Sequence, residues 1–129
     1  MTLNRNLKRA ILARHAEVLS WLSRLPRVYE TPAQIFVHAG VDEQAGELWR
    51  AATPDYVLTE KYPATVGPFL KTVVAGHVRT CSLHEDGVAR RLPRRSSHCF
   101  IDGSVETTGR LNILRYDHAT GVYGGLSAN

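Results

Sequence analysis

Two apolar segments of this chain each end in a histidine next to a glycine, and this repeated arrangement constrains the fold more than any other feature. The first segment is Ile35 to Gly40 (IFVHAG), and the second is Thr72 to His77 (TVVAGH). Short apolar runs bounded by glycine are typical of buried strands, and ligands in α/β folds bind at the carboxyl ends of such strands. The sequence therefore predicts an α/β domain whose strands deliver two imidazoles, those of His38 and His77, to a shared metal site.

The chain is long enough for one domain with a core of its own, because it has 129 residues. Its hydrophobic fraction of 43% and charged fraction of 22% are ordinary for a soluble globular protein. No apolar stretch is long enough to cross a bilayer, and the first residues contain no apolar signal core. We therefore expect a single domain over residues 1–129, located in the cytoplasm and without a membrane partner.

The two cysteines, Cys81 and Cys99, are not arranged in a CxxC motif. Both lie in segments with strand-like composition, so we expect them to be buried. In a reducing compartment they are free thiols in the simplest interpretation, although neighbouring strands would also allow them to pair.

The N-terminal region has the apolar spacing of an amphipathic helix over residues 6–25. Leu7, Ile11, Val18 and Leu22 recur at intervals of three, four and seven residues, and Pro26 ends the pattern. We expect this helix to cover one face of a sheet. Membrane binding is not favoured, because Glu17 and His15 interrupt the cationic side of the helix.

The remaining elements lie in a sheet-forming region over residues 33–123. Strands are expected at 33–37, 72–75, 82–85, 98–102, 111–117 and 122–123, with a short helix within 42–50 and a long irregular connection from Lys61 to Pro68. The last three strands would form an antiparallel hairpin system, with turns at Asp102-Gly103 and Thr120-Gly121. The predicted fold is therefore α/β (α+β) with a mixed sheet.

The net charge of +4 indicates only a weak attraction to anions. The basic residues form two groups, which are Arg5, Lys8, Arg9 and Arg14 near the N-terminus and Arg90, Arg91, Arg94 and Arg95 around Pro93. We interpret both groups as solvated surface. Nucleic-acid binding is a less favoured alternative, because the aromatic residues on which bases stack are not interleaved with these cations.

Two imidazoles do not complete a metal site, because zinc usually takes at least three protein ligands. Carboxylates that could contribute are Asp42, Asp55, Asp102 and Asp117. Asp102 ends an expected strand and would orient a metal-bound imidazole by a hydrogen bond; the alternative is a turn residue in an Asp-Gly pair. The other histidines share no pattern and are expected at the surface: His15, His84, His98 and His118.

The two histidine segments, FVHAGV at 36–41 and VVAGHV at 73–78, resemble the C-terminal half of the calcineurin-like metallophosphoesterases. The branch they most resemble is that of bacterial serine/threonine protein phosphatases and diadenosine tetraphosphatases. Residues 21–26, 101–104 and 109–112 are similar to further segments of that family, so the resemblance covers residues 19–123. It implies half of a β-sandwich flanked by helices, with a mixed sheet and antiparallel C-terminal hairpins.

In that family, two metal ions are bound by the segments GDxH, GDxxD and GNH and by the histidines of the VHAG and GH segments. The first three segments are absent from this chain. The resemblance therefore implies that His38 and His77 are ligands of one metal ion, with manganese expected first and iron or zinc as alternatives. Where the family has GHTP, this chain has GHVR, so that Arg79 either faces a phosphate or is an ordinary exposed arginine.

The resulting expectation is the C-terminal portion of a metal-dependent phosphoesterase, with a phosphoprotein or a dinucleoside polyphosphate as substrate of the full-length form. Because the other ligands are missing, the chain alone should bind metal weakly and be inactive, unless a complementary N-terminal chain supplies them. The main alternative is a non-catalytic binding module that retains the fold.

Overall fold

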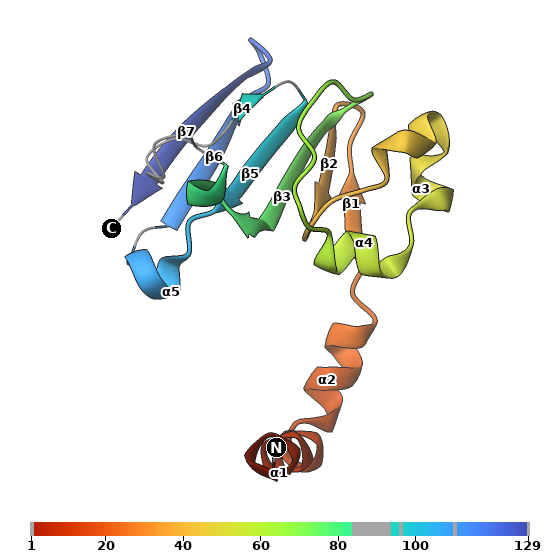
Figure 1. Ribbon diagram of the computed structural model, residues 1–129, viewed down its shortest axis with the longest axis vertical. Coiled ribbons are helices and arrows are strands. Elements are labelled where there is room, and N and C mark those ends of the chain that lie inside the picture. The colour runs from red at the N-terminus through yellow and green to blue at the C-terminus, as the bar shows by residue number, and fades with distance from the viewer. Residues whose placement is uncertain (1, 84–93, 96, 110, 129) are drawn as a thin grey trace.

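The computed structural model describes residues 2–83, 94–95, 97–109 and 111–128, which form two sheets and several short helices (Figure 1). The helices are α1 (Thr2–Arg14), α2 (Ala16–Ser23), η1 (Glu43–Leu48), α3 (Trp49–Ala52), α4 (Asp55–Glu60), η2 (Thr80–Ser82) and α5 (Val105–Thr108). The strands are β1 (Val28–Glu30), β2 (Gln34–Val37), β3 (Thr72–Arg79), β4 (Arg94–Arg95), β5 (His98–Asp102), β6 (Leu111–Asp117) and β7 (Val122–Ala128). The fold is α+β, as the sequence predicts.

The larger sheet has the strand order β1-β2-β3-β5-β4 and is mixed. Strands β2, β3 and β5 are parallel, and the edge strands β1 and β4 are antiparallel to their neighbours. The expectation that β5 belongs to an antiparallel hairpin with β6 is therefore wrong. The side chain of Asp102 accepts a hydrogen bond from the Ser104 N–H (2.8 Å), and the chain then enters α5 instead of returning along β5.

The core lies on the face of this sheet that is covered by the helical connection between β2 and β3. It is formed by buried residues of β2, β3 and β5 together with α3 and the loop before η1: Ile35, Val37, Val41, Trp49, Val73, Ala75 and Phe100. Alternate side chains of a strand point to opposite faces. Gln34 accordingly points away from this core and donates a hydrogen bond to the Tyr123 hydroxyl of β7 (2.9 Å).

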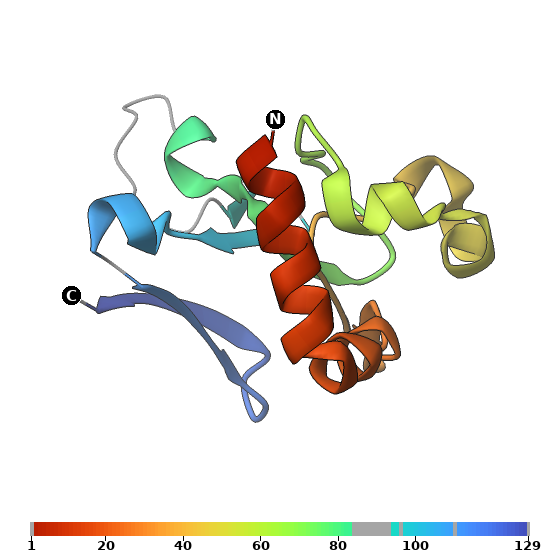
Figure 2. The ribbon, with the colours of Figure 1, turned by 90° about the horizontal axis from the view of Figure 1, so that it is seen from below.

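The second sheet is the antiparallel hairpin β6–β7, which lies against the other face of the larger sheet (Figure 2). Its turn uses Gly121, whose φ of 68° favours glycine. The Asp117 carboxylate accepts hydrogen bonds from the backbone N–H groups of Ala119 and Thr120 (2.9 and 3.1 Å). These contacts confirm the predicted strand 111–117 and the predicted turn at Thr120-Gly121.

The N-terminal helix differs from its prediction in two respects. It is broken into α1 and α2 at His15, where the backbone leaves the helical region (φ −132°, ψ 29°). It also does not cover a sheet, because every residue from 4 to 25 except Leu19 is exposed, and Figure 1 shows both helices projecting away from β1. An amphipathic pattern specifies an apolar face but not the surface that will bury it.

The segment after β3 also differs from its prediction. Cys81 lies in the helical turn η2 and is partly exposed, where a buried strand residue was expected, and residues 84–85 of that expected strand lie outside the described residues. Cys99 is buried on β5 as predicted, and no disulfide joins it to Cys81. The edge strand β1 was not predicted, because three residues are too few to show a periodic pattern.

The core assignment predicts that replacing two isoleucines by alanine will lower the free energy of unfolding by very different amounts. Ile35 is fully buried, whereas Ile113 on β6 is 41% exposed. Ile35→Ala should lower the free energy of unfolding by about 3 kcal/mol, because it leaves a cavity in the core. Ile113→Ala should cost less than about 1 kcal/mol, since this side chain loses little burial. Urea unfolding followed by circular dichroism measures both, and equal losses would contradict this core.

Candidate metal centre

His38 and His77 lie side by side at the carboxyl ends of the parallel strands β2 and β3. Their ring centroids are 5.0 Å apart and the ring planes are inclined by 61°. The strand pairing brings them together: Val37 is in register with Ala75, and just beyond it the Gly76 N–H donates a hydrogen bond to the His38 carbonyl (2.9 Å). Both side chains are exposed, so the two imidazoles are accessible from solvent.

The backbone of His77 is held in an unusual conformation. Its φ is 57°, in the left-handed region that most side chains disfavour, and the pairing of β3 with β5 is irregular between Ala75 and Arg79. A register shift within a strand, as at a β-bulge, changes the direction in which a side chain leaves the strand. Such strained residues are concentrated at functional sites, where the surrounding structure holds them in place.

The loop that follows His38 is fixed by Lys61, which lies just after α4. The Lys61 ammonium donates hydrogen bonds to the Val41 carbonyl (2.5 Å) and to the carboxylate of Glu43. The Ala39 N–H donates to the Leu58 carbonyl (2.9 Å). The residues on either side of Gly40 are therefore attached to the helical connection, which restrains the position of His38.

Glu43 also contacts His98, which was expected at the surface but is only 2% exposed. The Nδ1 atom of His98 lies 3.1 Å from the Gly67 carbonyl, and its Nε2 atom lies 3.1 Å from the Glu43 carboxylate. The ring is therefore held between a backbone carbonyl and a carboxylate, which are both hydrogen-bond acceptors. His98 is thus part of a buried charged cluster with Glu43 and Lys61. Its position at the start of an apolar strand was the signal that could have indicated burial.

Burial by itself raises the pKa of Glu43, but the hydrogen bonds from His98 and Lys61 outweigh it and lower the pKa to about 2. The carboxylate is therefore charged at every physiological pH. Because one carboxylate joins η1, β5 and the residue after α4, the cluster holds together the elements beside the histidine pair.

The predicted carboxylates and Arg79 have local structural partners. Asp102 forms the turn to Ser104 described above, which supports its interpretation as a turn residue. Asp42 caps η1 through the Gln44 N–H (3.1 Å), and Asp55 pairs with Arg27. Arg79 lies 3.7 Å from Glu106, with both side chains exposed. His15 and His118 are exposed as predicted, and His84 lies outside the described residues.

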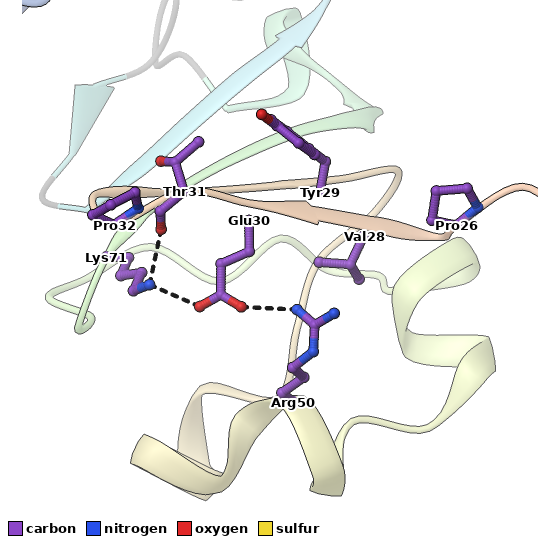
Figure 3. Close-up of a pocket in the computed structure, with 8 residues that line it drawn as sticks. All are labelled: Pro26, Val28, Tyr29, Glu30, Thr31, Pro32, Arg50 and Lys71. Carbon is purple, nitrogen blue, oxygen red and sulfur yellow. Dashed lines mark hydrogen bonds and ion pairs between the residues drawn. The ribbon is translucent and has the colours of Figure 1, made fainter.

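A separate cavity of about 550 Å³ lies along β1 (Figure 3). Its charged groups are paired with one another: Glu30 accepts hydrogen bonds from Arg50 (2.8 Å) and Lys71 (2.7 Å). The hydrogen bond from Lys71 lowers the pKa of Glu30. Neither histidine of the pair lines this cavity, so it is distinct from the candidate metal centre.

Within the described part of the chain, no three histidine, cysteine, aspartate or glutamate side chains form a group that could hold a metal ion. The histidine pair therefore offers two ligands. A scan of protein-family models and searches of curated proteins and of solved structures found no match to this chain. The relationship to the metallophosphoesterases stays a prediction from the motifs.

The charged cluster makes the stability of the fold depend on pH. The pKa of Glu43 is lowered from 4.5 to about 2, so its contribution is complete above pH 4.5 and is lost as the pH falls toward 2. At neutral pH, Glu43→Gln should cost about 2 kcal/mol, because a charged hydrogen-bond acceptor is removed. Urea unfolding at a series of pH values should show this difference shrinking below pH 4.5. Glu47→Gln is the matched control, because Glu47 is exposed on the same helix.

The strained backbone at His77 predicts that replacing each histidine by glycine will affect the stability of the fold differently. His77→Gly should leave the free energy of unfolding unchanged or raise it by up to about 1 kcal/mol, because glycine adopts the left-handed conformation without a steric penalty. His38 does not have a positive φ, so His38→Gly should lower stability by about 0.5–1 kcal/mol. Thermal unfolding measures both. A large loss in His77→Gly would mean that this ring holds the fold together.

Proposed function

We propose that this chain is the C-terminal portion of a metal-dependent phosphoesterase, in which His38 and His77 are ligands of one metal ion. The observation that supports this most directly is the 5.0 Å separation of their ring centroids at the carboxyl ends of two parallel strands. Adjacent exposed imidazoles are unfavourable when both are protonated, and they are a natural pair of ligands when both are neutral. The order of the VHAG and GH segments along the sequence supports the family assignment.

The imidazoles of His38 and His77 provide part of the ligand set that a metal centre needs. Two imidazoles suit zinc or iron, whereas manganese prefers sites that also contain carboxylates. A complete centre needs further anionic ligands, and in this proposal a complementary N-terminal segment or chain supplies them. When bound, the metal would act as a Lewis acid that polarises a phosphoryl oxygen and lowers the pKa of a bound water.

The residues of this chain have positioning roles in the proposed centre. The β2–β3 pairing sets the spacing of the imidazoles, and His77 lies in the irregular part of the β3–β5 pairing with its ring beside that of His38. Lys61 and Glu43 fix the loop after His38. Arg79 lies two residues beyond His77, and its ion pair with Glu106 is long (3.7 Å) and exposed, so it could exchange Glu106 for a phosphate group.

The proposal predicts weak binding of Zn²⁺ that depends on both histidines. In a titration of the full chain followed by NMR of the imidazole nitrogens, His38 and His77 should respond together, with one ion bound. His38→Ala should weaken binding at least about tenfold and remove the response of His77, since a single imidazole remains. His118→Ala is the matched control, because His118 is exposed on the β6–β7 turn, and it should leave binding unchanged.

Two outcomes would contradict the proposal. One is Zn²⁺ binding that persists in the His38→Ala/His77→Ala double variant. The other is hydrolysis of p-nitrophenyl phosphate by the chain alone with Mn²⁺ that survives both changes. If the ion binds as expected but a complementary N-terminal chain restores no hydrolysis, the pair would instead belong to a non-catalytic binding module.

A further inference from the structure

The helices α1 and α2 expose apolar side chains that nothing in the described chain buries. On α1, Leu7 is 58% exposed and Leu12 is 49% exposed, and on α2, Trp21 is 55% exposed and Leu22 is 48% exposed. Figure 1 shows both helices standing apart from the two sheets. Leu7 and Leu12 line a groove together with Leu19 of α2, and a group of exposed apolar side chains of this kind marks an interaction site.

Helix α1 is also strongly cationic. Helix α1 carries Arg5, Lys8, Arg9 and Arg14 and contains no acidic residue. None of these four takes part in an ion pair with another residue that the structure describes. The break at His15 produces this separation, because it places Glu17 in α2 and leaves α1 with positive charge alone.

We propose that α1 and α2 form a docking arm for an anionic phospholipid surface, which replaces the sequence-based expectation of no membrane partner. Cationic side chains combined with exposed leucine, isoleucine and tryptophan are the chemistry that holds a helix in the plane of a membrane interface. Lysine and arginine side chains near an anionic bilayer are attracted to its surface. The interaction is peripheral, since no helix among the described residues is long and apolar enough to cross a membrane.

A second copy of the chain is a poorer occupant of this surface. Pairing α1 with its own copy would bring two groups of four cations together, and Glu17 is the one acidic residue within residues 1–25 that could offset them. The apolar groove between the helices, lined by Leu7, Ile11 and Leu19 among others, would accommodate acyl chains without requiring a shape-matched partner. Charge therefore favours lipid over self-association.

Trp21 gives a direct measurement of this docking. The chain has two tryptophans, and Trp49 is buried in the core at 4% exposure, so a change in emission reports on Trp21. Adding vesicles of phosphatidylglycerol and phosphatidylcholine to the full chain should shift the emission to shorter wavelength. Binding should be at least about tenfold tighter than to phosphatidylcholine alone, and added salt should weaken it.

Matched variants distinguish the contribution of the docking arm to vesicle binding from that of the net charge of the protein. Arg9→Glu should weaken vesicle binding at least about fivefold, whereas Arg115→Glu, the same charge change on exposed β6, should leave it nearly unchanged. Leu7→Asp should likewise weaken binding more than Leu111→Asp, because the two leucines are similarly exposed (58% and 55%) but only Leu7 lies on the arm. Circular dichroism checks that each variant is folded.

Three results would overturn the proposal: no vesicle binding, equal binding to neutral and anionic vesicles, or equal loss in Arg9→Glu and Arg115→Glu. A Trp21 shift that appears without vesicles as protein concentration rises would identify a second copy as the occupant instead. None of these measurements involves His38 or His77, so the proposal of a docking arm and that of a metal centre can be contradicted independently.

Discussion

The parallel pairing of β2 with β3 is the interaction on which the rest of the structure depends. It places Ile35 beside Val73 and Val37 beside Ala75 on the face that packs against Trp49. The same ladder continues past the end of β2, where the Gly76 N–H reaches the His38 carbonyl. One hydrogen-bonded register therefore determines both the centre of the core and the distance between the two imidazoles, so a change in register would disrupt both.

The cluster of Glu43, His98 and Lys61 complements this pairing. Burying a carboxylate is unfavourable unless it is paired and hydrogen-bonded, and here two donors meet it from β5 and from the residue after α4. The cluster thus attaches the helical segment between β2 and β3 to strand β5 of the sheet. Together with the burial of Val41 in the core, it also explains why the loop after His38 has a fixed path.

Much of the secondary structure could be predicted from local pattern. The strands 33–37, 98–102 and 111–117 are apolar or alternating runs bounded by turn residues, and such runs encode extended structure directly. The partners of those strands were less predictable. Strand β5 pairs in parallel with β3 rather than with β6, because the Asp102 side chain holds a turn that leads into α5. Likewise, the apolar spacing of residues 6–25 indicated helix correctly but gave no information about the break at His15 or the absence of a covering sheet.

For the candidate site too, some features could be predicted from local sequence and others could not. The sequence alone determined that His38 and His77 each end an apolar strand, because strand formation and the neighbouring glycines are local properties. Only the tertiary structure decided that the strands are adjacent and parallel, that His77 lies where the pairing of β3 with β5 is irregular, and that His98 is buried against Glu43 rather than exposed. These outcomes depend on contacts between residues far apart in the chain, such as Glu43 and His98, and the free energy of such contacts is set by packing and burial that no local pattern contains.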